Sequence, residues 1–425
     1  MTKVRSAPPL WLIGLALSLG AAVSLGVTRF AYGLLLPAMR ADLGWSYTLA
    51  GGMNTANALG YFLGALATPW LMRRWAPGTL LVVGALLATV FMGLSGFFVA
   101  AEPLLLQRLL AGVASALVFI AGGLLAARLG AQDPARGGFL IGLYYGGTGL
   151  GIVVSALLVP AVLDWAQAAE AFPVHTWRWA WWALAIACLV GSAALVWPAR
   201  VMERMARMAA GVATEAALGP AADAPGLVVN ATAPGVSHAE FRWRAFTFAL
   251  GGYTLFGVGY IGYMTFVVAL LREQGSSAQA VTVFYTLLGL AVLASSRIWA
   301  GLLDRHKDGR ALATLNALLG VATIIPAVTA YPPAVLLSGL LFGGVFLSLV
   351  ASTTALVRHN LSPSAWAAGI SAFTTVFAAG QIIGPTIVGW IADGPGGLAR
   401  GLVFSAIALW LGAALALKQK ALQPP

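Results

Sequence analysis

Charged side chains are scarce in this sequence, because only 9% of its 425 residues are Asp, Glu, Lys or Arg. A water-soluble domain carries about 25%. A chain that is 60% apolar, with a mean hydropathy of +0.89, cannot cover itself with a polar surface. This composition excludes a water-soluble enzyme, a soluble nucleic-acid-binding protein and a disordered chain. The single cysteine, Cys188, excludes an intrachain disulfide.

Histidine and acidic residues are also few, and they do not cluster. The four histidines (175, 238, 306 and 359) are scattered over predicted loops, so no metal site is indicated. No Ser/His/Asp or Cys/His constellation is visible, and no glycine motif opens a strand–turn–helix unit. We therefore expect no catalytic residue, no metal and no cofactor, and we predict that the protein is not an enzyme.

Long apolar runs, in contrast, fill the chain. One membrane span needs about 20 apolar residues, and twelve runs separated by proline, glycine and charges are long enough. They cover residues 10–36, 46–72, 78–100, 103–129, 138–160, 177–197, 244–271, 278–303, 311–330, 333–357, 366–392 and 398–417. The sequence therefore predicts an all-α membrane protein with twelve transmembrane helices.

The basic residues predict how the protein is oriented. An even number of spans puts both termini on one side of the membrane. Of the 24 Lys and Arg residues, 17 fall on that side, four fall on the opposite side and three lie inside spans. Because cytoplasmic loops carry the excess of basic residues, we predict a multi-pass protein of the bacterial inner membrane with both termini in the cytoplasm.

One polar stretch divides the chain into two halves. We predict an N-terminal six-helix bundle over 1–197, a cytoplasmic linker over 198–242 and a C-terminal six-helix bundle over 243–425. The start of the linker, residues 200–208, is expected to be an amphipathic helix on the membrane surface.

The two halves share an internal repeat with an offset of 231 residues. The matched positions are Gly26 with Gly257, Arg73-Arg74 with Asp304-Arg305, Gly112 with Gly343, and Gly149 with Gly380. Parallel duplicated halves are typical of transporters that hold the substrate between two bundles near mid-membrane.

Several motifs resemble the major facilitator superfamily over nearly the whole chain. Residues 301–310, Gly-Leu-Leu-Asp-Arg-x3-Gly-Arg, are similar to its signature loop G-x-L-x-D-R-x-G-R. The first-half copy departs from it, with Arg73 where the family has aspartate. The other similar segments are Arg108-x3-Gly112, Gly380-Gln381-x2-Gly384-Pro385, and residues 28–37 with 257–261, which resemble the YbfB/YjiJ-like branch.

The resemblance implies two pseudo-symmetric six-helix bundles and a monomeric secondary transporter that works by alternating access. Its partners would be the lipid bilayer, a small-molecule substrate and a co-transported proton, without nucleic acid. The alternative within this fold is a multidrug or metabolite efflux carrier, although the Gly-Pro pattern of antiporters is not met in the fifth span. An intramembrane enzyme or a channel is the alternative of another class.

Three arginines inside spans are the sharpest functional signal. A charge at the centre of a span costs roughly 2.5–3.5 kcal/mol on insertion scales, yet no carboxylate lies deep within any span to pair with Arg29, Arg108 or Arg297. A substrate carboxylate would be such a partner, so we predict a small organic anion as substrate. In the other interpretation, Arg29 caps carbonyls of a neighbouring helix and Arg297 packs helices or forms a gate.

Polar and aromatic residues on the same helix faces complete the predicted substrate site. In a continuous helix, Tyr32 shares a face with Arg29, and Asn54, Asn57 and Tyr61 share another. The predicted substrate-binding residues are Arg29, Tyr32, Asn54, Asn57, Tyr61, Tyr260, Tyr263, Arg297 and Gln381. For the asparagines, hydrogen bonding between helices is the competing interpretation, and for the tyrosines it is packing.

A second group of residues is predicted to act in coupling or gating. Asp304, Arg305 and Arg310 belong to the signature-like loop, where a carboxylate near a helix N-terminus can hold one state of the transporter. For Arg108, the family resemblance implies proton coupling or support of the first span. The simpler interpretation of the loop is a solvated turn.

Overall fold

The computed structural model describes residues 8–133, 135–169, 174–218, 242–362 and 365–422, and within them the chain is helical without strands. The N-terminal half contains α1 (Leu10–Ala21), the π-helix η1 (Ala22–Val27), α2 (Tyr32–Leu43), α3 (Tyr47–Leu71), α4 (Pro77–Ser95), α5 (Ala101–Gly130), α6 (Gly137–Ala168) and α7 (Trp177–Leu218). The C-terminal half contains the 3₁₀-helix η2 (Trp243–Phe246), α8 (Thr247–Glu273), α9 (Ala278–Ile298), α10 (Ala300–Arg305), α11 (Arg310–Val328), α12 (Pro332–Asn360), α13 (Trp366–Ala392) and α14 (Gly397–Leu417).

These helices confirm the predicted twelve-span architecture. Eleven helical segments of the described residues are long and apolar enough to cross a membrane. The twelfth segment is α3, which has 25 residues and no charge. It contains two polar amide side chains, Asn54 and Asn57.

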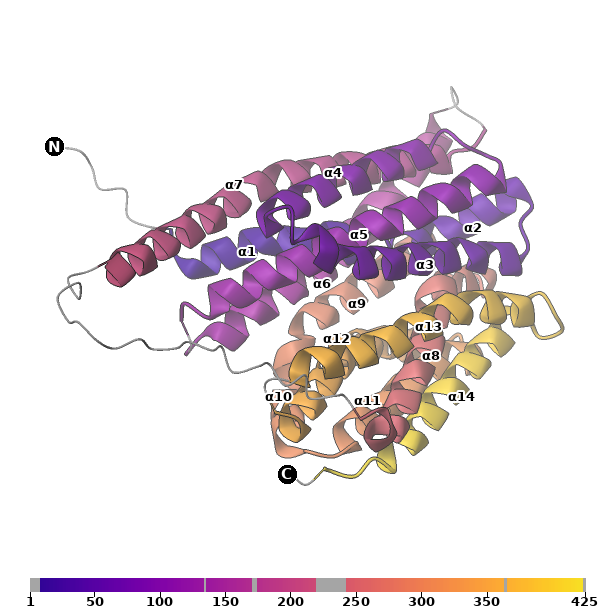
Figure 1. The fold of residues 1–425 in the computed structure, drawn as a ribbon. Coiled ribbons are helices and arrows are strands. Elements are labelled where there is room, and N and C mark those ends of the chain that lie inside the picture. Colours follow the sequence, from indigo (N-terminus) through magenta and orange to yellow (C-terminus); the bar gives the residue numbers. More distant parts are fainter. Residues whose placement is uncertain (1–7, 134, 170–173, 219–241, 363–364, 423–425) are drawn as a thin grey trace.

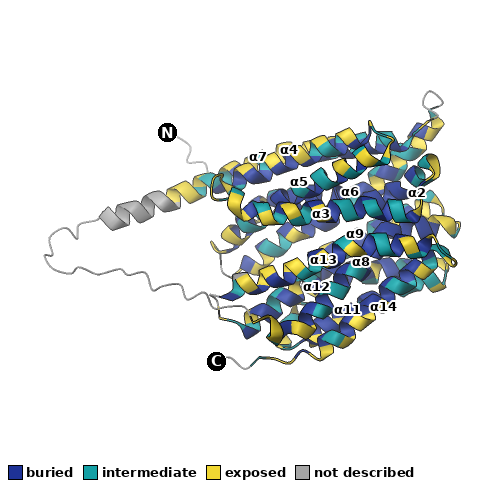
Figure 2. Cartoon of the chain, turned by 45° about the vertical axis from the view of Figure 1, so that its right-hand side comes forward, coloured by how far each residue is buried: buried dark blue, intermediate teal, exposed yellow. Residues whose placement is uncertain are grey.

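The helices form two bundles that lie side by side (Figure 1). Both ends of the chain lie at the same end of the molecule, which we call the terminal end, and the opposite end is called the far end (Figure 1). Buried residues line the surfaces where helices meet, both within each bundle and between the bundles (Figure 2).

Close helix contacts reproduce the internal repeat. A Cβ on Gly112 would lie 2.1 Å from the carbonyl oxygen of Asn57, and a Cβ on Gly343 would lie 2.2 Å from that of Leu288. Asn57 and Leu288 are themselves 231 residues apart. Because only glycine permits such a close backbone approach, α5 packs on α3 in the same way as α12 packs on α9.

One predicted pair of the repeat is wrong. Gly380 of α13 approaches α8 of its own bundle, whereas Gly149 of α6 approaches Gly289 of α9 in the other bundle. The glycine of α6 that approaches Gly26 is Gly151, just as Gly380 approaches Gly257. Gly151 is therefore the structural counterpart of Gly380, and Gly149 belongs to the interface between bundles.

The first span is not the continuous helix that the sequence predicts over residues 10–36. It changes from α-helix to π-helix at Ala22, passes through turns at residues 28–31, and resumes as α2 as far as Leu43. Arg29 therefore lies in the interruption, so the shared helix face predicted for Arg29 and Tyr32 does not exist. Arg29 is fourteen residues from the end of α2, about 21 Å along a helix, and thus lies near mid-span.

The sixth span is also longer than predicted. Helix α7 does not end at Trp197 but continues through Pro198 to Leu218 as one helix of 42 residues. Residues 200–208 therefore extend the span beyond its bundle, and they do not form a separate surface helix (Figure 2). The rest of the predicted linker, residues 219–241, lies outside the described residues.

At the far end, the two bundles touch through the backbones of α3 and α13. A Cβ on Gly51 would lie 2.2 Å from the carbonyl oxygen of Pro385, and a Cβ on Gly389 would lie 2.2 Å from that of Tyr47. Further along, Thr55 still donates a hydrogen bond to the carbonyl of Ile382 at 2.7 Å. The bundles are therefore closed against each other at this end.

Towards the terminal end, the facing surfaces of α3 and α13 become exposed. On α3, Leu59 lies one turn beyond Thr55 and Leu66 lies three turns beyond it, and both are exposed. On α13, Ser371 and Thr375 are exposed. Because the same helix faces are buried at the far end and uncovered at the terminal end, the space between the bundles opens towards the termini.

A carboxylate strengthens the far-end contact. Asp393, just after α13, accepts hydrogen bonds from the backbone N–H of Tyr47 at 2.6 Å, and from the N–H and hydroxyl of Thr48 at 2.9 and 2.6 Å. These are the first two N–H groups of α3, which have no partner within their own helix. Ser46 accepts the third, from Leu49. We call the contact of Asp393 with α3 the far-end cap.

The far-end cap favours the ionised carboxylate. Burial raises the pKa of Asp393, but the hydrogen bonds from Thr48 and Tyr47 outweigh burial and bring the net pKa below the usual value. The contribution of the cap to closure is therefore present above the usual aspartate pKa of about 3.9, and it is lost only as the pH falls through the lowered value.

Replacing this carboxylate should loosen the far end. We expect Asp393→Asn to shift the bundles towards the state open at the far end by about threefold, because a neutral amide interacts less favourably with a helix N-terminus. Spin labels on Ala100→Cys and Pro395→Cys, at the far ends of the two bundles, would report the distance.

In the unmodified protein, this distance distribution should stay constant between about pH 5 and 8, because Asp393 remains ionised there. The matched control is Asp133→Asn, at the terminal end, which should leave the distribution unchanged. An equal shift in both variants would show that the cap has no special role.

Candidate functional site

The interruption of the first span leaves backbone carbonyls that need partners. At η1 the backbone N–H groups bond to the carbonyl five residues earlier, where an α-helix uses the carbonyl four residues earlier. The N–H of Thr28 donates to the Val23 carbonyl, and the N–H of Phe30 donates to the Leu25 carbonyl. The Thr28 hydroxyl also donates to the Val23 carbonyl at 2.6 Å. Inside a membrane, freed backbone groups must be satisfied by other protein groups.

One side chain from each bundle supplies these partners. Arg108 of α5 donates from Nη1 to the Thr28 carbonyl at 2.7 Å. Tyr285 of α9, in the other bundle, donates its hydroxyl hydrogen to the Phe30 carbonyl at 2.9 Å, beside a longer bond at 3.3 Å from the N–H of Gly33 to the same carbonyl. Arg29 stands between these two carbonyls in the sequence, so its position depends on both bundles.

Arg108 extends its contacts across the bundle interface. Its Nη2 donates to Oδ1 of Asn54 at 2.9 Å, and Nδ2 of Asn54 donates to the Thr265 hydroxyl of α8 at 2.7 Å. Its guanidinium also lies 5.0 Å from the centre of the Tyr32 ring. Asn57 donates to the Arg108 carbonyl at 3.0 Å. Arg108, Asn54 and Asn57 therefore form a network that joins α5, α3 and α8.

Arg29 is equally buried but has very different surroundings. Its side chain is 3% exposed, and its Nη2 has no hydrogen-bond partner. The guanidinium lies 5.7 Å from the centre of the Tyr61 ring. The hydroxyls of Tyr61 and Tyr260 are both within electrostatic reach of its charge. Among the described residues, no carboxylate is buried near it.

The structure brings together only some of the predicted substrate-binding residues. Tyr260 donates its hydroxyl hydrogen to Oε1 of Gln381 at 2.9 Å, so these two residues join Arg29 and Tyr61. Because Gln381 accepts on Oε1, its Nε2 keeps both hydrogens for another acceptor. These four residues, drawn from both bundles, form the centre of the candidate site.

Two predicted tyrosines are engaged elsewhere. Tyr32 donates its hydroxyl hydrogen to the Ala50 carbonyl at 2.9 Å, which joins α2 to α3. The Tyr263 hydroxyl lies 2.7 Å from that of Ser338, which itself donates to Ala322, and so joins α8 to α12 and α11. Both tyrosines hold helices of one bundle together.

Arg297 lies away from the centre of the site. Its side chain is exposed on the last turn of α9, and its guanidinium is 5.3 Å from the centre of the Phe139 ring of α6. Because α6 and α9 belong to different bundles, Arg297 lies at their interface on the terminal side of Arg29.

Aromatic rings that the sequence did not single out surround the centre. Phe119 of α5 lies 6.5 Å from the Tyr61 ring and 5.4 Å from the ring of Tyr145 on α6. In the other bundle, Phe346 of α12 stacks on Tyr260 at 5.1 Å. Phe119 is the lone aromatic residue of α5, whereas Tyr145 follows Tyr144 and Phe346 follows Phe342 by one turn. None of these local patterns marks a binding site, and only the folded structure groups the rings.

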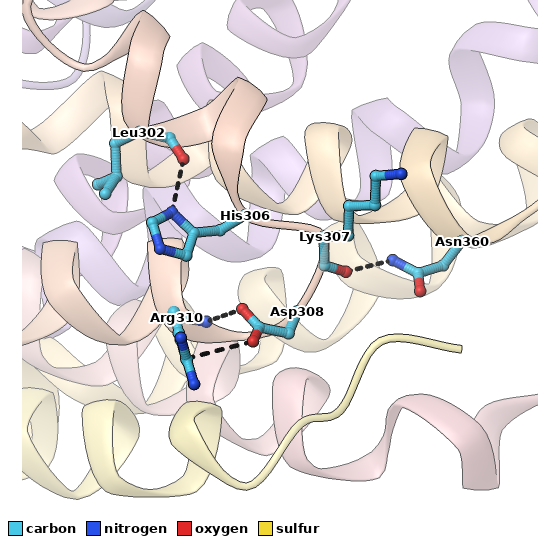
Figure 3. A network of polar contacts seen from close by, with 6 residues as sticks. All are labelled: Leu302, His306, Lys307, Asp308, Arg310 and Asn360. Carbon is cyan, nitrogen blue, oxygen red and sulfur yellow. Dashed lines mark hydrogen bonds and ion pairs between the residues drawn. The ribbon is translucent and has the colours of Figure 1, made fainter. Parts of the chain in front are cut away.

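The predicted gating loop follows α10 at the terminal end, and Figure 3 shows its polar contacts. Arg310 pairs with Asp308 in the same loop, Nε to Oδ2 at 3.3 Å. Asn360, at the end of α12, donates to the Lys307 carbonyl at 2.7 Å and accepts from the N–H of Leu422. Asn360 thus ties the loop to the C-terminal segment, a role that the sequence did not reveal.

Asp304 and Arg305 lie just before that loop, and both side chains are exposed. In the first half, Arg73 and Arg74 are exposed as well, and Arg74 lies over the Trp70 ring at 4.5 Å. All four side chains are therefore accessible at the terminal end in this conformation.

Comparison with known proteins identifies the family. The model of the family described as "Uncharacterised MFS-type transporter YbfB" matches residues 21–417. The chain belongs to this family of major facilitator superfamily transporters. The predicted resemblance is thereby confirmed. No curated protein sequence matches the chain.

Solved transporters share the fold at low sequence identity. A bacterial homologue of the human lysosomal transporter Spinster, in an inward-facing and unoccupied conformation, has a TM-score of 0.66 at 15% identity, over 97% of this chain and 99% of that one. The nucleoside transporter NupG has 0.65 at 12%, over 97% and 100%. A bacterial homologue of the human drug peptide transporters PepT1 and PepT2 has 0.63 at 14%, over 96% and 95%.

The two buried arginines of this family member should respond oppositely to substitution. Arg108→Gln removes the partner of the Thr28 carbonyl and of Asn54, so we expect the free energy of unfolding to fall by about 3 kcal/mol. Arg29→Gln removes an unpaired buried cation, so we expect stability to stay constant or rise.

Thermal unfolding of both variants in the same detergent would measure this difference, with Arg136→Gln on an exposed loop as the control. Equal losses of stability for Arg108→Gln and Arg29→Gln would mean that Arg29 also holds the fold together.

Proposed function

We propose that this transporter carries small organic anions between its two bundles by alternating access. The observation that carries the proposal is Arg29, a cation that is buried near mid-span without a hydrogen-bond partner for its Nη2. A buried charge is costly unless it is paired. A bound anion would supply the missing partner.

A carboxylate suits this position. The planar guanidinium of arginine presents its donors in a fork that matches two carboxylate oxygens. The hydroxyls of Tyr61 and Tyr260 and the amide of Gln381 add polar groups beside it. A deep site with few convergent polar groups and mostly aromatic walls is typical of small-molecule recognition.

Access to the site would come from the terminal end in this conformation. The bundles are closed at the far end by the far-end cap and by the glycine contacts of α3 and α13. The faces of the same helices are uncovered towards the termini. Rocking of the bundles about Arg29 would open the far end and close the terminal end.

We further propose that the terminal end faces the cytoplasm of a bacterial inner membrane. Basic residues concentrate in the loops and termini of that end, with 17 of 24 there by sequence count. This distribution agrees with the positive-inside rule. Because the two halves of one chain supply all the central residues of the candidate site, we propose a monomer as the working unit.

The remaining predicted residues receive roles along the access route. Arg297, exposed between α6 and α9, would attract the anion before it reaches Arg29. Asp304, Arg305 and Arg310 would form contacts between the halves when the terminal end closes. Arg108 would transmit movement, because its network reaches Thr265 in the other bundle.

Binding of anions should depend on Arg29. Purified protein is screened by thermal shift against lactate, succinate, glucuronate and benzoate, with uridine and tetraphenylphosphonium as neutral and cationic controls. We expect at least one anion to stabilise the protein, and Arg29→Gln to weaken its binding by about 100-fold, as when one partner of a buried charge pair is removed.

Arg297→Gln should weaken binding less than tenfold, because an exposed charge acts mainly on the association rate. Uptake of the same anion into proteoliposomes at two pH values then shows whether a proton accompanies it. Stabilisation by the cation alone, or anion binding that survives Arg29→Gln, would contradict the proposal and favour an efflux carrier.

A further inference from the structure

The rings around Arg29 carry information about the body of the substrate, beyond its charge. Arg29 is joined by aromatic side chains from both bundles, and these form two groups. We call Tyr61, Phe119 and Tyr145 the N-terminal aromatic wall, and Tyr260, Phe346 and Phe377 the C-terminal aromatic wall.

The N-terminal aromatic wall has uncovered ring surface. Tyr61 and Phe119 are half-buried, and Tyr145 is 37% exposed. Phe119 holds the other two rings in place, with ring centres 6.5 Å from Tyr61 and 5.4 Å from Tyr145. Arg29 lies over the Tyr61 ring, so this wall begins directly at the cation.

The C-terminal aromatic wall is a stack of nearly parallel rings. Tyr260 and Phe377 lie 5.5 Å apart at 22°, and Tyr260 and Phe346 lie 5.1 Å apart at 23°. Tyr260 and Phe346 are buried, whereas Phe377 is half-buried, so the ring of Phe377 is the one that remains reachable.

The two walls lie close to each other across the bundle interface. Tyr61 of the first wall is within electrostatic reach of Tyr260 in the second wall and of Tyr253, on which Phe377 stacks at 4.9 Å. Phe30, next to Arg29, meets Phe346 edge to face at 5.8 Å. Uncovered rings of both bundles therefore flank the same buried cation.

We propose that the transported anion is a small aromatic carboxylate, with its carboxylate at Arg29 and its ring between the two aromatic walls. This inference rests on the proposed anion transport and narrows its substrate class. Aromatic pairs gain about 0.5–1.5 kcal/mol beyond the burial of their area, and a saturated ring cannot make this gain. A sugar acid would bury hydroxyl groups against ring surfaces that offer few partners, which is costly.

Matched pairs of aromatic and saturated carboxylic acids test the effect of ring aromaticity on binding, because both members of a pair have the same charge and nearly the same size. The pairs are benzoate with cyclohexanecarboxylate, phenylacetate with cyclohexylacetate, and 3-phenylpropionate with 3-cyclohexylpropionate. Binding to the full-length purified protein is measured by calorimetry, and transport is measured by counterflow in proteoliposomes. We expect the aromatic member of at least one pair to bind about tenfold more tightly than its saturated partner, as two ring contacts would give.

Substitutions in the walls should remove this preference but keep anion binding. Phe377→Leu and Phe119→Leu retain apolar volume without a ring, so each should reduce the aromatic preference to about threefold or less. Phe373→Leu is the matched control on α13. Phe373 is 2% exposed and packs on Phe246 and Tyr253, away from the uncovered surface, so the preference should remain.

The outcomes distinguish this inference from the proposed function. Equal binding of aromatic and saturated acids, still abolished by Arg29→Gln, would overturn the aromatic class and leave anion transport standing. The same conclusion follows if only lactate, succinate or glucuronate binds. If no anion binds in either screen, both proposals fail. An unchanged preference in Phe377→Leu and Phe119→Leu would also overturn the assignment of the walls.

Discussion

The membrane interior offers no water to a broken helix, and this constraint shapes the centre of the protein. Once the first span is interrupted at residues 28–31, its freed carbonyls require donors from elsewhere in the chain. Arg108 and Tyr285 supply them, one from each bundle. The network through Asn54 to Thr265 follows from the same need, because the guanidinium of Arg108 must itself be satisfied.

Two arginines of similar burial therefore have separate tasks. Arg108 donates from Nη1 to the backbone and from Nη2 to Asn54, so only the buried Nε of its guanidinium is left without a partner. Arg29 is one of the residues of the interruption itself, and its Nη2 has no hydrogen-bond partner. One cation thus holds the unusual backbone, and the other is the one that we propose for substrate recognition. Burial alone does not tell the two apart, whereas their hydrogen-bond partners do.

The sequence predicted the architecture well because twelve apolar runs, a repeat of 231 residues and the signature-like loop are all local patterns. It could not predict the interruption, since residues 28–31 contain no proline, and an unbroken helix was the natural expectation. The shared face of Arg29 with Tyr32 failed for that reason. Of the aromatic walls, Tyr61 and Tyr260 were predicted as site residues, whereas Phe119 and Phe346 were missed because they meet those tyrosines only when α5, α12, α3 and α8 pack.

The far-end cap has a further consequence for how this family can vary in sequence. An ion pair between two side chains is lost when either residue changes. Asp393, by contrast, accepts three hydrogen bonds, and two of them come from backbone N–H groups. Every residue except proline provides such a group. These two hydrogen bonds of the cap therefore do not depend on which side chains stand at positions 47 and 48, whereas the backbone contacts at Gly51 and Gly389 do require glycine.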